Sequence, residues 1–438
     1  MSGAQNQNTW NLSKELWPQD AINDEVLDSS PAFGTIQKQT DFGEIIRHIA
    51  VGTGMPQGVG TKFEIAKGNK SPATAQVFAL KEKTLYVVIS IDGVLLRKAR
   101  VKGHEGMIVD PYTRESELAI QQWKNEQSSY FFGNGGGSLG QIGAISPQNV
   151  GGSGLNFGAN YFLLKNINDI RRFQQEMQLN FATSDGTEAV TAGPLGGRAK
   201  ITEVQEHGQL KGLVGTNVAD LAAAGYSANN YIFRDGIYAD VIPGKNAWIP
   251  RGTPGQADPV TGITTPGTFL GVDRTKSPSK LAGIRFDARK MNILDGIIGA
   301  ASAIADCRGK ADLAIISTAD WNLLRIQTQG AGVVTRTLLP AAAIGTYKPG
   351  LSYRAFEIEG PNGPLQVLAD PWCPVGRGYV EQSNTWTYLC VNELVALTGD
   401  PLRTEEVSDS GESRFVGDGT PYCKSPYYNA TVQFADGV

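Results

Sequence analysis

Residues 111–143, PYTRESELAIQQWKNEQSSYFFGNGGGSLGQIG, decide the fold, because an uninterrupted helical pattern runs here into a glycine-rich turn. Thr113 is a suitable helix cap, and Glu115 and Glu117 place favourable negative charge in the first turn. One stripe carries large side chains at helical spacing, namely Ile120, Trp123, Gln127 and Phe131. The pattern predicts a helix over 113–132 that is about 30 Å long and ends at Gly133.

The whole chain has 438 residues, enough for two or three packing units of about 150 residues each. Its 53 glycines and 22 prolines favour an architecture rich in strands and loops. The formal net charge is -4, and the sequence contains no basic block. Proteins that grip nucleic acid need clustered basic side chains to neutralise phosphates, so we expect only loose, non-specific contact with DNA.

The four cysteines are widely spaced and form no C-x-x-C pair: Cys307, Cys373, Cys390 and Cys423. This spacing predicts free thiols in a reducing compartment. The first residues, MSGAQNQNTWNLSKELW, lack the layout of a secretory signal, and no apolar run approaches the ~18 residues of a membrane-spanning helix. We therefore expect a protein that is made and kept in the cytosol.

Upstream of the long helix, two segments alternate in the manner of strands, 61–65 (TKFEI) and 76–80 (QVFAL), with the polar residues 67–72 between them. A two-stranded hairpin cannot bury both of its own faces, so it must lean on a partner. Residues 84–90 form a further β-rich segment, and 91–100 are expected to form a short helix that leads into the long one.

Downstream of the glycine turn, we expect a strand at 142–145 and a helix over 166–180. The inward face of that helix would carry Ile167, Ile170, Phe173 and Met177. From 182 to 287, short strands alternate with glycine and proline, for example at 198–204, 210–214 and 230–234. We interpret this region as a β-rich elaboration, with residues 243–266 as a long surface loop.

The following segment predicts a helix capped by Asp287, with an apolar face at Ile293, Ile297, Ala300 and Ile304. A buried strand at 312–317 comes next, and a Ser/Thr/Asp cap then starts a helix that bears Trp321. Further strands are expected at 365–370, 374–380, 388–397 and 427–434.

Three of these features together resemble the tailed-bacteriophage major capsid (coat) proteins, which have the Hong Kong-97-type fold. The first is the long helix followed by the pair Phe131-Phe132 and a G-N-G turn. The second is the hairpin that precedes this helix. The third is FLGVDR at 269–274, followed by a helix, a buried strand and the helix start Asp320-Trp321. The resemblance covers roughly residues 40–438.

The resemblance implies an α+β fold with an N-terminal arm, an extended β-hairpin loop, a peripheral domain with a spine helix, an axial domain and a β-rich insertion. The expected boundaries are 1–50 for the arm, 51–90 for the extended loop, 91–205 for the peripheral domain with spine helix 113–132, 206–286 for the insertion, 287–395 for the axial domain and 396–438 for strands that return to the peripheral domain.

Catalytic patterns are hard to find. His48, His104 and His207 are the only histidines, and none lies at a metal-ligand spacing from another. Residues 135–140 match G-x-G-x-x-G, but a helix precedes them and a strand follows, the reverse of a dinucleotide site. No phosphate-binding G-x-x-x-x-G-K-[ST] occurs. We expect neither an enzyme nor a bound cofactor or metal.

As a member of this family, the chain would form pentamers and hexamers that close into an icosahedral shell around the double-stranded DNA of a tailed phage. The expected inter-subunit contacts are Trp10 and Trp17 in the arm and Lys67, Asn69, Lys70 and Ser71 at the hairpin tip, with Trp123 and Phe131 holding the spine. Two alternatives stay open: an encapsulin-type nanocompartment shell, and an α+β enzyme or β-rich binding module.

Some family members join a lysine of the extended loop covalently to an asparagine of a neighbour; the candidates here are Lys67 or Lys70 with Asn429. The resemblance also implies a separate scaffolding protein during assembly and a portal protein at one vertex. It allows a decoration protein on the outside. No membrane contact is expected, and the shell would be assembled in the host cytoplasm and end up in the virion.

Overall fold

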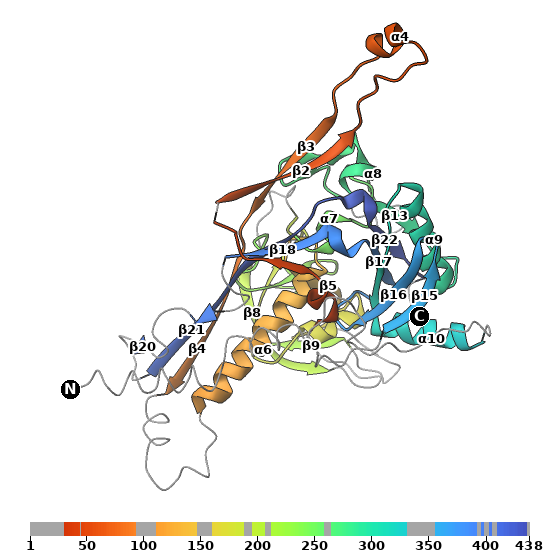
Figure 1. The fold of residues 1–438 in the computed structure, drawn as a ribbon. Helices are drawn as coiled ribbons and strands as arrows, with labels where there is room; N and C mark the ends of the chain where they lie inside the picture. Colours follow the sequence, from red (N-terminus) through yellow and green to blue (C-terminus); the bar gives the residue numbers. More distant parts are fainter. Residues whose placement is uncertain are drawn as a thin grey trace.

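The computed structural model describes residues 30–43, 45–92, 111–146, 160–187, 195–205, 212–257, 264–330, 355–391, 396–397, 403–404 and 410–435. Helices and strands are mixed along the chain. Figure 1 shows a body that contains several sheets, a long helix α6 across it, and a hairpin that leaves it and carries the helix α4 at its far end.

The predicted long helix is confirmed as α6 (Pro111–Phe131). It begins two residues earlier than expected, at a proline, whose fixed φ suits the first turn of a helix. Thr113 therefore lies inside the helix, and the prediction that it caps the helix is wrong. At the other end, the backbone N–H of Gly133 donates to the carbonyl of Tyr130 at 2.8 Å, which closes the last turn.

α6 is buried on more than the predicted stripe. Trp123 and Phe131 are fully buried as expected, yet Lys124 and Glu126, which lie off that stripe, are only 3% and 6% exposed. Gln127, the polar member of the stripe, donates to the hydroxyl of Tyr388 at 2.8 Å. The helix is therefore enclosed by neighbouring elements, and Gln127 finds a hydrogen-bond partner there.

One of these neighbours is a sheet built around two long strands, β4 (Thr84–Asp92) and β21 (Ser410–Cys423), which pair antiparallel over their shared length. The smaller strands of this sheet are β1 (Gln37–Gln39), β18 (Trp386–Cys390), β19 (Ala396–Leu397) and β20 (Arg403–Thr404). The indole N–H of Trp123 donates to the carbonyl of Leu85 at 3.2 Å, which ties α6 to β4. Of the short helix expected at 91–100, Ile91 and Asp92 belong to β4, and the remainder lies outside the described residues.

Six strands close into a barrel: β5 (Ser138–Ile145), β6 (Tyr161–Leu164), β7 (Gln178–Ala182), β8 (Leu195–Gln205), β9 (Leu213–Thr216) and β10 (Tyr231–Arg234). Around the barrel the order is β10-β5-β6-β9-β8-β7. Phe162, Phe181 and Ile232 are fully buried. The barrel thus differs from the predicted insertion at 206–286, because it starts at Ser138 and pairs strands on both sides of that boundary.

The helix expected over 166–180 is not formed. The chain makes a short 3-10 helix, η2 (Ile167–Arg172), and then enters β7. Ile170, Phe173 and Met177 are buried as expected, but Ile167 is about half exposed. β7 pairs with both β8 and β10, and this pairing with distant segments holds the end of the predicted helix in an extended conformation.

A second six-stranded sheet, in the order β13-β22-β17-β14-β16-β15, carries two helices. Its elements are β13 (Ile284–Asp287), α9 (Ile293–Asp306), β14 (Leu313–Ser317), α10 (Thr318–Gly330), β15 (Ala355–Gly360), β16 (Gly363–Asp370), β17 (Arg377–Glu381) and β22 (Ala430–Gln433). The predicted order of helix, buried strand and Trp-bearing helix is confirmed. Ser317 and Asp320 cap α10 reciprocally, with Ser317 Oγ donating to Asp320 Oδ2 at 2.7 Å and the Asp320 N–H donating to Ser317 Oγ at 3.0 Å.

Asp287 does not cap α9, so that prediction is wrong. α9 begins after Asn292, and Asp287 ends β13. The side chain of Asp287 instead accepts hydrogen bonds from Arg289, which lower the pKa of its carboxyl to about 2. The remaining short elements are α3 (Pro31–Gly34), α7 (Lys245–Trp248), β11 (Thr268–Phe269), β12 (Val272–Asp273), η4 (Arg274–Lys276), α8 (Pro278–Leu281), η6 (Ser383–Thr385) and η7 (Pro426–Tyr428).

The predicted hairpin exists, and its strand at 76–80 is confirmed as part of β3 (Thr74–Lys81), but its other strand is β2 (Ile46–Gly54) and not 61–65. Residues 61–65, predicted to be a strand, lie at the tip, where α4 (Phe63–Gly68) forms. The partner of β3 is the segment 46–54. Left without a strand to pair with, the tip satisfies its backbone locally in a helical turn.

Candidate assembly site

The root of the hairpin is fixed to the body by aromatic packing. The ring of Phe78 in β3 lies 5.2 Å from that of Trp248 in α7 and 6.0 Å from that of Phe269 in β11, centroid to centroid. The N–H of Ala79 also donates to the carbonyl of Leu270 at 3.0 Å. Aromatic clusters of this kind stabilise beyond simple burial. The root is therefore a firm attachment.

α7, which supplies Trp248, is itself held by a buried ion pair. Lys245 Nζ lies 2.6 Å from both carboxylate oxygens of Glu381, and both side chains are almost completely buried. The same ammonium lies over the rings of Trp386 and Phe131, at 4.3 and 4.9 Å. Burial raises the pKa of the Glu381 carboxyl, and the charge of Lys245 opposes that rise. This cluster joins α7, β17, β18 and the end of α6.

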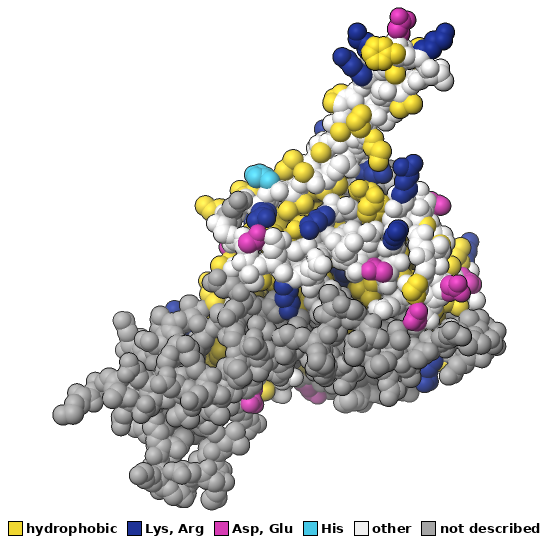
Figure 2. Space-filling model, viewed as in Figure 1, with side chains coloured by type: hydrophobic (Ala, Val, Ile, Leu, Met, Phe, Trp, Pro, Cys, Tyr) yellow, Lys and Arg dark blue, Asp and Glu magenta, His cyan; other side chains and the backbone are white. Residues whose placement is uncertain are grey.

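Beyond the root, the hairpin leaves the body, as Figures 1 and 2 show. The register runs from Ile46 opposite Lys81 to Gly54 opposite Thr74, with a bulge between Gly52 and Gly54. No residue of α4 is buried. Large apolar side chains are nevertheless concentrated at this end, with Met55 71%, Val59 78%, Phe63 80% and Ile65 50% exposed. Exposed apolar groups clustered at the end of a projection indicate a binding surface.

The tip, residues 55–73, makes its own internal contacts. The N–H of Gln57 donates to Ser71 Oγ at 3.2 Å, and the α4 N–H of Ala66 donates to the carbonyl of Lys62 at 3.0 Å. The tip also carries basic residues, Lys62, Lys67 and Lys70, and its acidic residue is Glu64. Figure 2 shows basic side chains, in dark blue, beside hydrophobic ones, in yellow, at the far end of the projection. The tip thus presents an apolar surface with a basic rim.

The structure places the residues singled out from the sequence as follows. Lys67, Asn69 and Lys70 are exposed at the tip, and Ser71 is partly buried by its bond to Gln57. Trp10 and Trp17 lie outside the described residues. The sequence prediction missed the apolar members of the tip, Phe63 and Ile65. Their alternation with charged residues in KFEIAK is the signal that was assigned to a strand.

Asn429 is a poor candidate for cross-linking, which corrects that expectation. Its side chain is fully buried, and its Oδ1 accepts from the Gln382 N–H at 3.1 Å and from the Trp386 indole at 3.2 Å. Its Nδ2 donates to Thr385 Oγ1 and to the carbonyl of Ser425, each at 2.9 Å. Within its own chain, the amide is therefore a buried internal connector.

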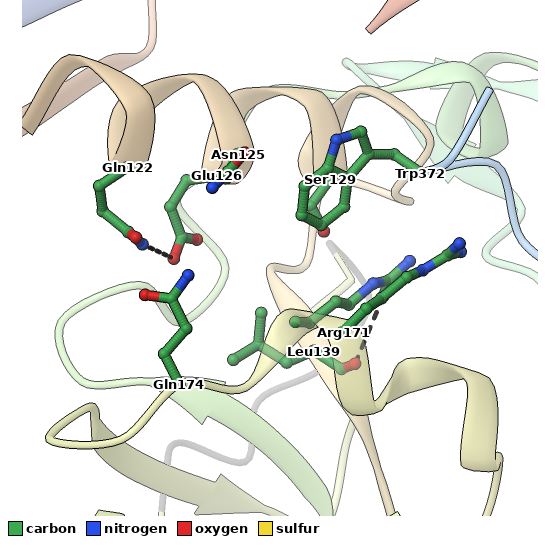
Figure 3. A pocket seen from close by; sticks show the side chains of 9 residues that line it. Gln122, Asn125, Glu126, Ser129, Leu139, Arg171, Gln174 and Trp372 are labelled. Carbon is green, nitrogen blue, oxygen red and sulfur yellow. Dashed lines mark hydrogen bonds between the residues drawn. The ribbon is translucent and has the colours of Figure 1, made fainter. Parts of the chain in front are cut away.

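A small cleft lies between α6 and η2 in the described part of the chain. Figure 3 shows the side chains that line it, which are Gln122, Asn125, Glu126, Ser129, Leu139, Arg171, Arg172, Gln174 and Trp372. Within the described ranges, no three His, Cys, Asp or Glu side chains gather in a metal-binding arrangement. No helix among the described residues is long and apolar enough to cross a membrane.

Neither a protein-family model nor a curated protein matches this chain. Solved structures similar to it include a chain of the cyanophage A-1(L) capsid asymmetric unit, with 11% identity, 93% of both chains covered and a TM-score of 0.49. Another comes from Mycobacterium phage Bobi, with 11% identity, 94% and 91% covered and a TM-score of 0.40. The SrpI encapsulin of Synechococcus elongatus has 6% identity, 92% and 88% covered and a TM-score of 0.42. Similarity of this degree assigns no function to the chain.

Proposed function

We propose that this chain is the subunit of a protein shell, the major capsid protein of a tailed phage. In this role, copies form pentamers and hexamers that close into an icosahedral container for double-stranded DNA. The observation that carries the proposal is the hairpin: its root is fixed, while its tip holds out Phe63, Val59 and Met55 to solvent. A side chain of this size gains stability only when it is covered, and a second copy of the chain supplies the cover in a shell.

The size of the tip suits repeated weak contacts. Covering one large apolar side chain contributes about 1.5–3 kcal/mol, and association costs on the order of 4–15 kcal/mol in lost freedom. A single tip therefore binds weakly by itself. A closed ring of copies forms the same contact at every interface, so the small binding free energies of the single contacts add up. A misplaced subunit can still dissociate while the assembly grows, because each contact is weak.

The other features of the proposal follow from the resemblance noted in the sequence. The residues before the buried Ser30 would act as an arm with Trp10 and Trp17 on a neighbour, and residues 287–395 would act as the axial domain. A scaffolding protein would guide closure, a portal protein would occupy one vertex, and contact with packaged DNA would be non-specific. The role is structural and not catalytic, and it places the protein in the virion after assembly in the host cytoplasm.

Assembly of tip variants tests the proposal. The chain is expressed with its scaffolding protein, and particles are detected by gradient sedimentation and electron microscopy. We expect closed shells from the unaltered chain and only unassembled protein from Phe63→Ser/Ile65→Ser. The matched control is Ile167→Ser on the barrel, since Ile167 is 47% exposed against 50% for Ile65. Shells from the tip variant in normal yield, or a monomeric unaltered chain under all assembly conditions, would refute the proposal.

The dependence on a scaffold is tested separately. The purified chain by itself is expected to give irregular or open assemblies when the protein concentration is raised. Uniform closed shells of one size from the chain alone would contradict the need for a scaffold and would favour the encapsulin-type alternative.

A further inference from the structure

The barrel is joined to the body through a narrow neck. Its first strand follows the turn 134–137, and its last strand leads into residues 237–243, which return beside that turn: the N–H of Ala239 donates to the carbonyl of Gly136 at 2.9 Å. A Cβ atom on Gly136 would collide with the carbonyl of Asp185, and one on Gly137 with that of Ile237. The segments that enter and leave the barrel therefore lie in close contact at Gly136, Gly137, Ile237 and Ala239.

Beside the neck, the barrel meets α6 across the polar cleft of Figure 3. Arg234 of β10 pairs with Glu126 of α6. In the part of the chain that is described, Glu126 Oε2, Arg171 Nε and Arg172 Nε are buried without a hydrogen-bond partner. The contact between the barrel and α6 is therefore polar, and some of its buried groups are left without a hydrogen-bond partner.

From the far side of this cleft, the barrel reaches the loop 370–373 between β16 and β17, which we call the coupling loop. Arg171 of η2 donates through Nη1 to the carbonyl of Pro371 and through Nη2 to that of Cys373, the latter at 3.0 Å. Guanidinium groups bind two acceptors at once in a fixed geometry. The barrel thus holds two carbonyls of the coupling loop with one side chain.

The same loop holds the first described residues of the chain, 30–33, which we call the N-terminal anchor. Asp370 Oδ2 accepts from Ser30 Oγ at 2.6 Å and from the Ala32 N–H at 3.0 Å, while Oδ1 accepts from the Trp372 N–H at 2.8 Å. Asp370 and Ser30 are completely buried. Phe33 then packs against Phe131 and Tyr388, with ring centroids 5.4 and 4.9 Å away.

The carboxylate of Asp370 therefore shapes the coupling loop and binds the N-terminal anchor. The guanidinium of Arg171 ties the same loop to the barrel. We propose that the coupling loop transmits the position of the barrel to the N-terminal anchor, so that releasing Arg171 loosens residues 30–33 although the two do not touch. Because binding free energies are reciprocal, loosening the anchor also loosens η2. The coupling belongs to a single chain and stands whether or not the chain builds shells.

Hydrogen exchange on the full-length chain tests this coupling, with all variants compared in the same assembly state. In Arg171→Met, we expect the amides of Ala32, Gly34 and Thr35 to exchange about tenfold faster than in the unaltered chain. The matched control is Arg198→Met, which removes a barrel arginine that is 73% exposed and pairs with Asp235. It should leave the anchor amides unchanged. Anchor exchange within about twofold of the unaltered chain in a folded Arg171→Met protein would overturn the proposal.

Two further variants protect the test against simple misfolding. Arg171→Lys keeps the charge but cannot bind both carbonyls, so we expect it to loosen the anchor as well. Ser30→Ala removes two hydrogen bonds at the opposite end, the one to Asp370 and the one from the Phe33 N–H, and the amides of Asp169 and Phe173, which close η2, should then exchange faster. If Arg171→Met does not fold, unchanged exchange at η2 in Ser30→Ala overturns the proposal and faster exchange supports it.

Discussion

At the scale of single residues, the pair Lys245–Glu381 shows how costly a buried charge is without its partner. The two side chains are about 1% exposed each. Lys245→Met leaves a buried carboxylate behind, so we expect the free energy of unfolding to fall by about 3–5 kcal/mol. The double variant Lys245→Met/Glu381→Leu should regain most of that loss. Lys200→Met, which breaks the exposed pair with Glu176, is the control and should cost about 0–1 kcal/mol. Denaturant unfolding measures all three.

The stability lost in Lys245→Met should depend on pH. Burial already raises the pKa of Glu381, and removing Lys245 takes away the charge that opposes the rise. A carboxyl whose pKa is raised on folding binds its proton more tightly in the folded state. Its contribution to the free energy of unfolding is therefore present at low pH and is lost as the pH rises through the folded pKa. The deficit of Lys245→Met should therefore shrink on acidification. A deficit that grows in acid would contradict this assignment.

Asn429 makes a different prediction at this scale. Since its amide connects β17, β18 and the turn before β22, Asn429→Ala should destabilise the chain by about 2–4 kcal/mol, at roughly 1 kcal/mol or more for each lost hydrogen bond.

Assembled particles of the unaltered chain, boiled in detergent, should run as a single band of subunit size. A ladder of covalent multimers would show that Asn429, or another residue, is cross-linked after all.

At the scale of elements, the hairpin divides into a root that matters for folding and a tip that does not. Replacing residues 55–73 by a short turn removes no buried side chain, so the free energy of unfolding should change by less than about 1 kcal/mol while assembly is lost. Phe78→Ala at the root should cost about 3–5 kcal/mol. Equal destabilisation by both changes would mean that the tip packs on its own body.

Local sequence patterns predicted the elements whose structure depends on local periodicity. The stripe of α6 and the face Ile293, Ile297, Ala300 and Ile304 of α9 gave correct helices, because each pattern repeats with the helical period. The segment 61–65 was misassigned, since KFEI alternates like a strand but had no strand to pair with. Residues 166–180 failed for the converse reason: the pairing of β7 with β8 and β10 lies outside any local window.

The candidate site was predicted only in part for the same physical reason. The tip was expected to touch another chain through its lysines, but the exposure of Phe63 and Ile65 became visible only once the fold showed what covers each side chain. The coupling between Arg171, Asp370 and Ser30 was not visible at all, because these residues are hundreds of positions apart and meet only through tertiary structure.

At the scale of the whole molecule, one continuous stretch of the chain forms the barrel, and the two ends of this stretch lie next to each other. Its strands run from Ser138 to Arg234 and pair only with one another to form a closed ring among the described strands. We expect a fragment of residues 138–234 to fold alone, with β-type circular dichroism and cooperative thermal unfolding. A fragment that stays unstructured at every temperature would show that the barrel needs the surface of α6 to fold.

The bulge between Gly52 and Gly54 separates the fixed root of the hairpin from its tip. Bulges let a ribbon bend at one point while the rest keeps its pairing. A sphere cannot be tiled by six-fold rings alone, so identical subunits must meet at more than one angle. A flexible joint at this position would let one amino-acid sequence adapt to both the flat and the sharply curved regions of a closed surface.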